Sequence, residues 1–211
     1  MRRLPVYILL DTSSSMCGEP IDAVQKGVGM LLETLRTDPY ALETAYISVI
    51  TFDSHVNQIC PLTELSFVEI PEITAYGMTS LGQALEFLGN AVDTEVSKTN
   101  SERKGDWRPL VFIMTDGIPT DNYRRGIRAM QKHKFGMVVA CAAGKKANTD
   151  ILKEITQSVV SLATVDRNTI QAFFKWVSAS VVVGSMKVED SGMNVQDLSD
   201  LPPPPSEITI V

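Results

Sequence analysis

Five oxygen-bearing side chains stand where the chain leaves an apolar run or approaches a helical pattern. They are Asp11, Ser13, Ser15, Thr79 and Asp116. Two carboxylates and three neutral hydroxyls suit a hard cation, so we expect Mg²⁺, with Mn²⁺ or Ca²⁺ as alternatives, and not zinc. Because only two of these groups are charged, the ion would keep positive charge. It would then attract an outside anion, most simply an Asp or Glu of a partner protein.

Two other interpretations of these residues remain open. Asp11 could be the nucleophile of a metal-assisted phosphohydrolase, since an Asp can form a covalent intermediate. Such a site would want a second acid two residues on, where Ser13 stands, and no phosphate-binding G-x-x-x-x-G-K-[ST] loop occurs. The chain could also be a metal-free scaffold that uses its helices or its tail. We favour a binding module and expect no enzyme activity.

Apolar periodicity defines the elements that must position these residues. Short apolar runs predict strands, and apolar residues at a spacing of three and four predict helices. The expected strands are 5–10, 44–52, 55–62, 110–114, 135–143 and 159–163. The expected helices are 21–35, 81–92, 123–133, 149–157 and 170–181.

Strands that alternate with helices indicate an α/β fold with a mainly parallel sheet. We expect six strands, helices on both faces, and one antiparallel edge strand from the hairpin formed by 44–52 and 55–62. Sites in such sheets form beyond the carboxyl ends of the strands. The expected strands 5–10 and 110–114 end just before Asp11 and Asp116. The fold would therefore bring the oxygen-bearing residues together.

The helical periodicity stops after Gly184. We therefore divide the 211 residues into a folded body, 1–184, and a tail or linker, 185–211. The tail contains five acidic residues, one basic residue and four consecutive prolines, and the prolines favour an extended polyproline II conformation.

Composition excludes several classes of protein. A formal net charge of -6 argues against a nucleic-acid binder, which would show a basic stripe. No apolar run approaches the roughly 18 residues of a membrane span. Three cysteines without C-x-x-C spacing indicate reduced thiols. We therefore expect a cytoplasmic protein with neither nucleic-acid nor membrane partners.

Three segments together resemble the metal-ion-dependent adhesion site (MIDAS) of von Willebrand factor type A (vWA) domains. They are the D-x-S-x-S of 11–15, the single Thr79, and the Thr-Asp-Gly of 115–117. The order of the segments and their strand and loop contexts fit over about residues 4–184. The resemblance implies a doubly wound, Rossmann-like fold.

The resemblance also implies roles for the site residues. Ser13 and Ser15 would ligate the ion directly, and Thr79 would do so when a ligand is bound. Asp11 and Asp116 would act directly or through water. We expect Met78, Ser80 and Gly117 to contact the partner.

Further segments resemble bacterial TerY-type proteins of the tellurium-resistance and stress-response neighbourhood. They are 2–7, 18–21, 38–46, 49–53 and 61–65. This resemblance implies a cytosolic module that binds protein partners. Because such proteins occur beside metal-dependent Ser/Thr phosphatases and kinases, it also implies a phosphorylation-linked complex.

Overall fold

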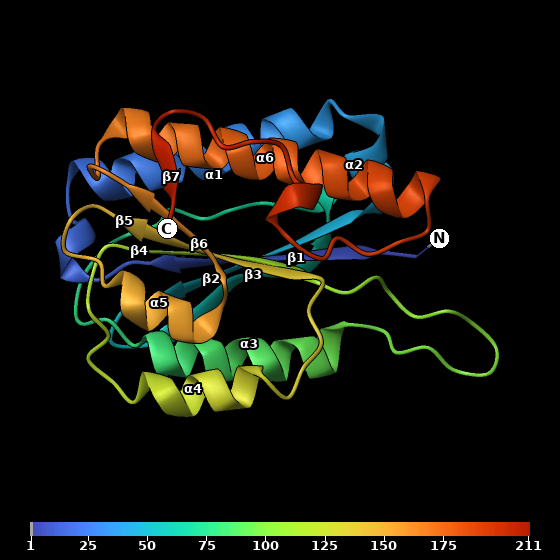
Figure 1. Ribbon diagram of the computed structural model, residues 1–211, viewed down its shortest axis with the longest axis horizontal. Helices are drawn as coiled ribbons and strands as arrows, with labels where there is room; N and C mark the ends of the chain where they lie inside the picture. Colours follow the sequence, from blue (N-terminus) through green and yellow to red (C-terminus); the bar gives the residue numbers. More distant parts are fainter. Residues whose placement is uncertain (1) are drawn as a thin grey trace.

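The computed structural model describes residues 2–211, in which a central sheet lies between two layers of helices (Figure 1). The strands are β1 Leu4–Asp11, β2 Ala45–Phe52, β3 Val56–Glu64, β4 Leu110–Thr115, β5 Met137–Ala143, β6 Ser158–Leu162 and β7 Ile208–Ile210. The α-helices are α1 Glu19–Arg36, α2 Pro39–Thr44, α3 Leu81–Glu95, α4 Tyr123–Met130, α5 Thr149–Ile155 and α6 Arg167–Asp190. Three short 3₁₀ turns are η1 Ser14–Met16, η2 Leu65–Phe67 and η3 Leu198–Asp200.

The strand order is β3-β2-β1-β4-β5-β6-β7. The five inner strands are parallel, while β3 and β7 pair antiparallel at the two edges. This confirms the mainly parallel α/β fold and the hairpin. The sheet has seven strands rather than the six expected, because the end of the chain adds β7 to β6. Ile208 lies opposite Leu162, and Ile210 opposite Val160.

Alternating side chains of β1 divide the core into two halves, as the period of a strand requires. Val6, Ile8 and Leu10 pack in the cluster that contains α1 and α6. Tyr7 and Leu9 pack in the cluster that contains α3, α4 and α5. Figure 1 shows the same two layers on opposite faces of the sheet. Because β1 is buried on both faces, its carboxyl end is a rigid support for a site.

Two helices differ from the expected pattern. The short α2 was not expected; Asp38 begins it by accepting a hydrogen bond from the Ala41 N–H at 2.8 Å. We expected α4 to reach His133, but it ends at Met130. His133 leaves the helix and contacts α3, where its Nε2 lies 3.0 Å from Asp93 Oδ2.

The last helix runs beyond the boundary that the sequence suggested. Gly184 lies inside α6, which continues to Asp190 and buries Val188 in its last turns. No Pro interrupts this stretch, so the helix persists although its apolar pattern weakens. Although α6 has 24 residues, no helix within residues 2–211 is long and apolar enough to cross a membrane.

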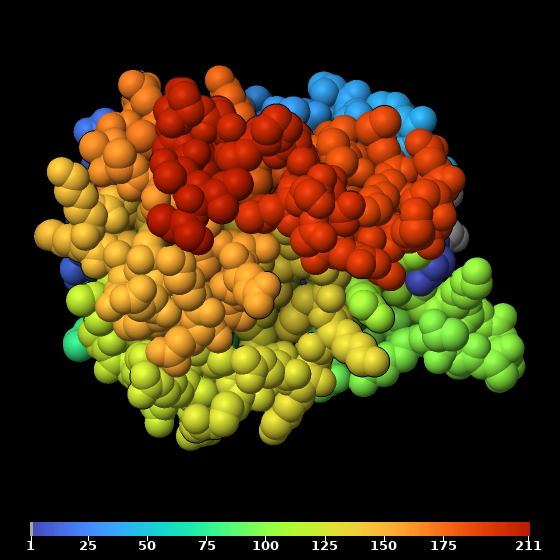
Figure 2. Space-filling model, in the orientation of Figure 1, coloured from blue at the N-terminus to red at the C-terminus, as the bar shows by residue number. Residues whose placement is uncertain are grey.

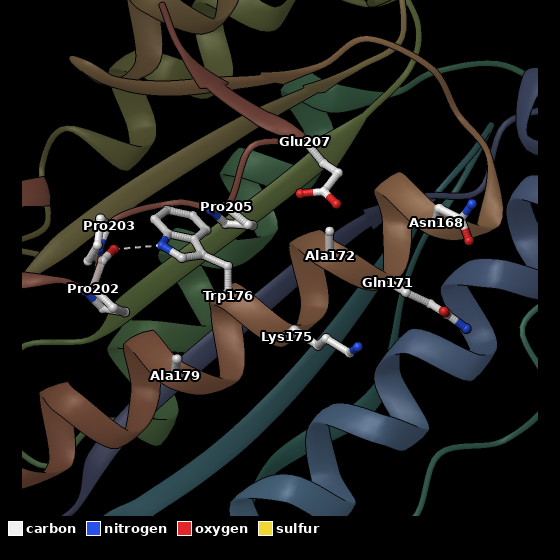
Figure 3. A pocket seen from close by; sticks show the side chains of 10 residues that line it. All are labelled: Asn168, Gln171, Ala172, Lys175, Trp176, Ala179, Pro202, Pro203, Pro205 and Glu207. Carbon is white, nitrogen blue, oxygen red and sulfur yellow. Dashed lines mark hydrogen bonds between the residues drawn. The ribbon is translucent and has the colours of Figure 1, made fainter.

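Residues 191–211 fold back over α6 and reach the edge of the sheet, where they cover one face of the molecule (Figures 1 and 2). The indole N–H of Trp176 donates to the Pro202 carbonyl at 2.8 Å, and Lys187 pairs with Asp200. Between α6 and the proline run lies an open cavity of about 500 Å³, above which the Glu207 carboxylate projects (Figure 3). The acidic tail is thus packed on its own domain.

Candidate metal centre

The candidate site lies where β1 and β4 end side by side. The chain passes from β1 to β2 on one side and later returns to β4 on the other, so this pair is the topological switch point of the sheet. Leu10 is paired with Met114, which puts Asp11 beside Thr115 and one residue from Asp116. The expected convergence of the two strand ends is therefore present. In Figure 1, these carboxyl ends lie at the left of the sheet, on the side opposite the marked N-terminus.

A continuous chain of hydrogen bonds joins the two serines to Asp116. Ser13 Oγ lies 3.0 Å from Ser15 Oγ, and the Ser15 hydroxyl donates to Asp116 Oδ1 at 2.7 Å. The Ser13 N–H donates to Asp11 Oδ1 at 2.8 Å, which turns the chain directly after the strand. The turn η1 follows, with the Met16 N–H bonded to the Ser13 carbonyl. The D-x-S-x-S spacing thus places both hydroxyls on the side of Asp116.

Thr115 holds Asp11 in place, a role that the Thr-Asp-Gly motif alone did not predict. The Thr115 hydroxyl donates to Asp11 Oδ2 at 2.5 Å across the β1–β4 pair. Asp11 is only 1% exposed, and this burial raises the pKa of its carboxyl group. The hydrogen bonds from Thr115 and Ser13 oppose that rise, and the charge of Asp116 adds to it. The Thr that precedes Asp116 was the only signal for this contact.

Thr79 enters the site from the loop before α3. Its carbonyl accepts the Thr120 N–H at 2.9 Å, and its own N–H donates to Thr120 Oγ1 at 3.2 Å. A Cβ at Gly117 would lie 3.2 Å from Thr79 Oγ1 and 3.9 Å from Asp11 Oδ2. The Thr79 hydroxyl and the Asp11 carboxylate therefore both face the space beside Gly117, which a larger residue would fill. The structure thus brings together all five residues expected to hold the ion.

Asp53 follows β2 directly and connects the loops around the site. Its backbone carbonyl accepts the Ser80 N–H at 2.9 Å, and its Oδ1 accepts the His55 N–H at 2.8 Å. Its Oδ2 accepts the Thr12 hydroxyl at 3.4 Å. Asp53 is 2% exposed, so it supports the site from within.

The three residues expected to contact a partner differ in exposure. Met78 is 55% exposed and stands next to Thr79. Gly117 is half-buried, and Ser80 is buried at the start of α3. A partner could therefore touch Met78 directly, whereas Ser80 lies below the surface.

The donor set fits a hard divalent cation. Among residues 2–211, no Lys, Arg or His forms an ion pair with Asp11 or Asp116, although both carboxylates are buried. Two neighbouring buried carboxylates without a cation are unfavourable, and a bound metal ion would compensate them. Within the described chain, no group of three or more His, Cys, Asp or Glu side chains could hold a metal. Any ion at this site therefore depends on the hydroxyl oxygens as well.

Comparisons with solved structures support the fold. The chain resembles a von Willebrand factor type A protein from Catenulispora acidiphila, with a TM-score of 0.64 and 18% identity over 86% of this chain and 43% of that one. It resembles proximal thread matrix protein 1 from the mussel byssus with a zinc-occupied MIDAS motif, with a TM-score of 0.61 and 17% identity over 84% and 48%. It resembles the ArnB paralog VWA2 from Sulfolobus acidocaldarius, with a TM-score of 0.59 and 15% identity over 87% and 45%.

This chain spans less than half the length of these three chains, and at such identities the likeness shows the fold alone. A search of curated proteins finds no match. The model of the von Willebrand factor type A domain matches residues 6–175, which include every strand of the sheet except β7 and the start of β1. Domains of this family generally mediate metal-dependent protein interactions. Since the family model covers most of the chain and the fold agrees with it, the chain belongs to the von Willebrand factor type A domain family.

Proposed function

We propose that this chain is a metal-ion-dependent binding module that captures an Asp or Glu of a partner protein. The observation that carries this proposal is the pair of buried carboxylates, Asp11 and Asp116, which have no basic partner among the described residues and adjoin a row of hydroxyls. A divalent cation there would neutralise the carboxylates and keep a coordination position for an outside anion.

Each residue of the site has a separate role in this proposal. Ser13 and Ser15 would hold the ion directly, and Thr79 would hold it when a partner is bound, as the resemblance to vWA domains implies. Asp11 and Asp116 would act directly or through water, and Thr115 orients Asp11 by its hydrogen bond. The cation would supply positive charge for an outside carboxylate.

Mg²⁺ is the cation that we propose, because every candidate ligand is a hard oxygen atom. Mn²⁺ and Ca²⁺ satisfy the same donor set. The zinc-occupied motif of the mussel protein makes zinc a further ion to compare. Titrations with each ion would rank them.

The surroundings of Asp11 favour binding over phosphohydrolysis. A phosphohydrolase of this kind would need a second acid two residues after the nucleophile, and Ser13 stands there. In this chain Asp11 Oδ1 accepts the Ser13 N–H and Oδ2 accepts the Thr115 hydroxyl, and Asp11 is 1% exposed. We therefore propose that the module is not an enzyme. Metal-dependent phosphatase turnover that Asp11→Ala abolishes would overturn this part of the proposal.

The cellular setting that we propose is a cytoplasmic, phosphorylation-linked complex of the bacterial tellurite-resistance and stress response. The similarity of 2–7, 18–21, 38–46, 49–53 and 61–65 to TerY-type proteins supports this setting. An associated Ser/Thr phosphatase or kinase is then the expected partner.

A pull-down from native cytosol with and without EDTA tests the binding proposal. We expect a partner that is retained with Mg²⁺, released by EDTA, and lost with the variant Ser13→Ala/Thr79→Ala. Replacing the partner's contacting acid by its amide should have the same effect. A partner that is retained both in the presence of EDTA and by the Ser13→Ala/Thr79→Ala variant would favour the metal-free scaffold.

A further inference from the structure

Three large apolar side chains are exposed on the two loops that carry Thr79 and Asp116. Tyr76 is 51% exposed, Met78 55% and Ile118 58%. Single exposed apolar residues are common, but an apolar group gathered around a polar site usually marks an interaction surface. We call these three side chains the apolar rim.

The loop that presents Tyr76 and Met78 is held in place by its backbone. The Tyr76 N–H donates to the Thr12 carbonyl at 2.8 Å, and the Gly77 carbonyl accepts the Ser14 N–H at 3.1 Å. The Met78 N–H donates to Ser54 Oγ at 3.0 Å. Gly77 has a φ of +75°, and a Cβ there would lie 2.5 Å from the same Ser54 oxygen, so the turn requires glycine. The exposure of the rim is therefore built into the fold.

Ile118 is presented on the other side of the site. It follows Gly117, whose Cα region adjoins Thr79 Oγ1 and Asp11 Oδ2, and it precedes Pro119. The bond from the Thr120 N–H to the Thr79 carbonyl, 2.9 Å long, ties this loop to the first. Met78 and Ile118 thus each lie next in the chain to a residue of the candidate site, Thr79 and Gly117 respectively.

Apart from Asp116 itself, the stretches of the two loops beside the site carry no charged side chain. Residues 75–80 and 117–120 contain no Asp, Glu, Lys or Arg. Apart from a bound cation, these two stretches would therefore offer a partner only apolar and neutral polar groups. They are complementary to one negative charge with apolar neighbours.

We propose that the apolar rim selects partners in which the metal-bound Asp or Glu is flanked on both sides by large apolar residues. This rests on the proposed function, because the cation brings the acid to the rim. Preordered loops lose little conformational entropy on binding, so apolar contacts there convert efficiently into affinity. The occupant is an acidic residue within an apolar segment of a partner protein.

The test uses three short peptides with the full chain and saturating Mg²⁺. The first has a central Glu flanked by leucines, the second has the same Glu flanked by serines, and the third has Gln between leucines. We expect the first to bind about tenfold or more tightly than the second, as burying apolar side chains predicts. The third should bind at background level. The chain variants Met78→Ser and Ile118→Ser should each weaken the first peptide about tenfold and leave Mg²⁺ affinity unchanged.

Phe67→Ser is the matched control, since Phe67 is 72% exposed and lies away from the site. It follows Glu64, which is paired with Tyr46 near the amino end of β2, whereas the site lies at the carboxyl ends of β1 and β4. Phe67→Ser should change nothing, and Met78→Leu should retain binding. Equal affinities of the first two peptides, or no binding of either while Mg²⁺ binds, would overturn the rim proposal and leave the metal centre intact. Failure of the chain to bind any divalent ion would instead overturn the proposed function beneath it.

Discussion

At the scale of single residues, the site differs from the described ion pairs in how its buried charges are balanced. Asp106 is paired with Arg3 at 2.5 Å, whereas Asp11 and Asp116 have only hydroxyl and N–H donors among the residues described. Hydrogen bonds stabilise a buried carboxylate but leave its charge in place. That residual charge is what distinguishes this pair from structural ion pairs.

The three cysteines should differ in reactivity because they differ in burial. Cys17 is exposed beside the site, whereas Cys60 and Cys141 are buried, and burial raises the pKa of both buried thiols. We expect a thiol reagent such as DTNB to titrate one thiol in the native chain and three after denaturation. Cys17→Ser should then show no fast-reacting thiol. Any fast-reacting thiol in native Cys17→Ser would contradict the described core.

At the scale of elements, the layer of α1 and α6 is held together by close contact. A Cβ on Gly27 of α1 would lie 2.2 Å from the ring of Phe174 in α6, whereas nothing lies within 4 Å of a Cβ on Gly29. Gly27 therefore lets the two helices approach, while Gly29 faces solvent in the same helix. Substitutions at these two glycines therefore distinguish the effect of helix packing from the effect of helix propensity.

Gly27→Ala and Gly29→Ala should change stability in opposite directions. The first should lower the free energy of unfolding by roughly 1–3 kcal/mol, because Phe174 must move. The second should raise it by about 0.5–1 kcal/mol, because Ala favours the helix. Urea unfolding measures both. Equal effects of the two substitutions would show that the α1–α6 contact is looser than described.

The start of α6 should contribute a pH-dependent stability. The Asp166 side chain accepts the N–H groups of Asn168 and Thr169, and a hydrogen bond from the Thr164 hydroxyl is the main cause that lowers its pKa. Because the pKa of Asp166 is lower in the folded chain than in the unfolded chain, its carboxylate stabilises the fold. This stabilisation is fully present above the unfolded pKa of about 3.9, and it is lost as the pH falls through the folded pKa.

Asp166→Ala should therefore lower stability by about 1 kcal/mol at neutral pH. The difference from the wild type should shrink below pH about 4, as the carboxylate becomes protonated. Asp166→Asn keeps the capping oxygen and serves as control. Urea unfolding at several pH values measures this; a difference that grows as the pH falls would contradict the sign.

Periodicity predicted the elements that bury a continuous face and missed those that depend on a distant partner. The apolar residues of α1 and the apolar run of β4 identify these elements without further information. By contrast, β7 is a three-residue strand that exists because the edge of β6 is beside it. Likewise, strand ends and spacing located Asp11 and Asp116, whereas the contact of Thr115 with Asp11 depends on the register of β1 against β4. The exposure of Tyr76 and Ile118 depends on loop conformation, which no local pattern encodes.

At the scale of the whole molecule, the last residues complete the fold. Val195, Leu201 and Ile208 are buried, and β7 covers the edge of β6 that would otherwise be open to pairing. The tail approaches the sheet across α6, whereas the site lies at the ends of β1 and β4 (Figure 1). The tail and the candidate metal site are therefore separate parts of the molecule.

Truncation after Asp190 should separate stability from metal binding. Each of the three buried apolar side chains contributes roughly 1.5–3 kcal/mol before the entropy of ordering the tail is counted. We expect residues 1–190 to melt at a lower temperature and to scatter more light on heating, because the edge of β6 is exposed. Mg²⁺ affinity measured well below that temperature should stay unchanged. An unaltered melting temperature would show that the tail does not stabilise the domain.

The central claim is that the five converging oxygen side chains hold a divalent cation, and isothermal titration with Mg²⁺ tests it most directly. We expect one ion per wild-type chain and an affinity loss of more than about tenfold in Ser13→Ala/Thr79→Ala. Ser66→Ala should bind as the wild type does, because the exposed Ser66 hydroxyl lies near the amino end of β2, away from the site. Equal binding by the wild type and the double variant, or none by either with Mg²⁺, Mn²⁺, Ca²⁺ and Zn²⁺ in turn, would contradict the claim.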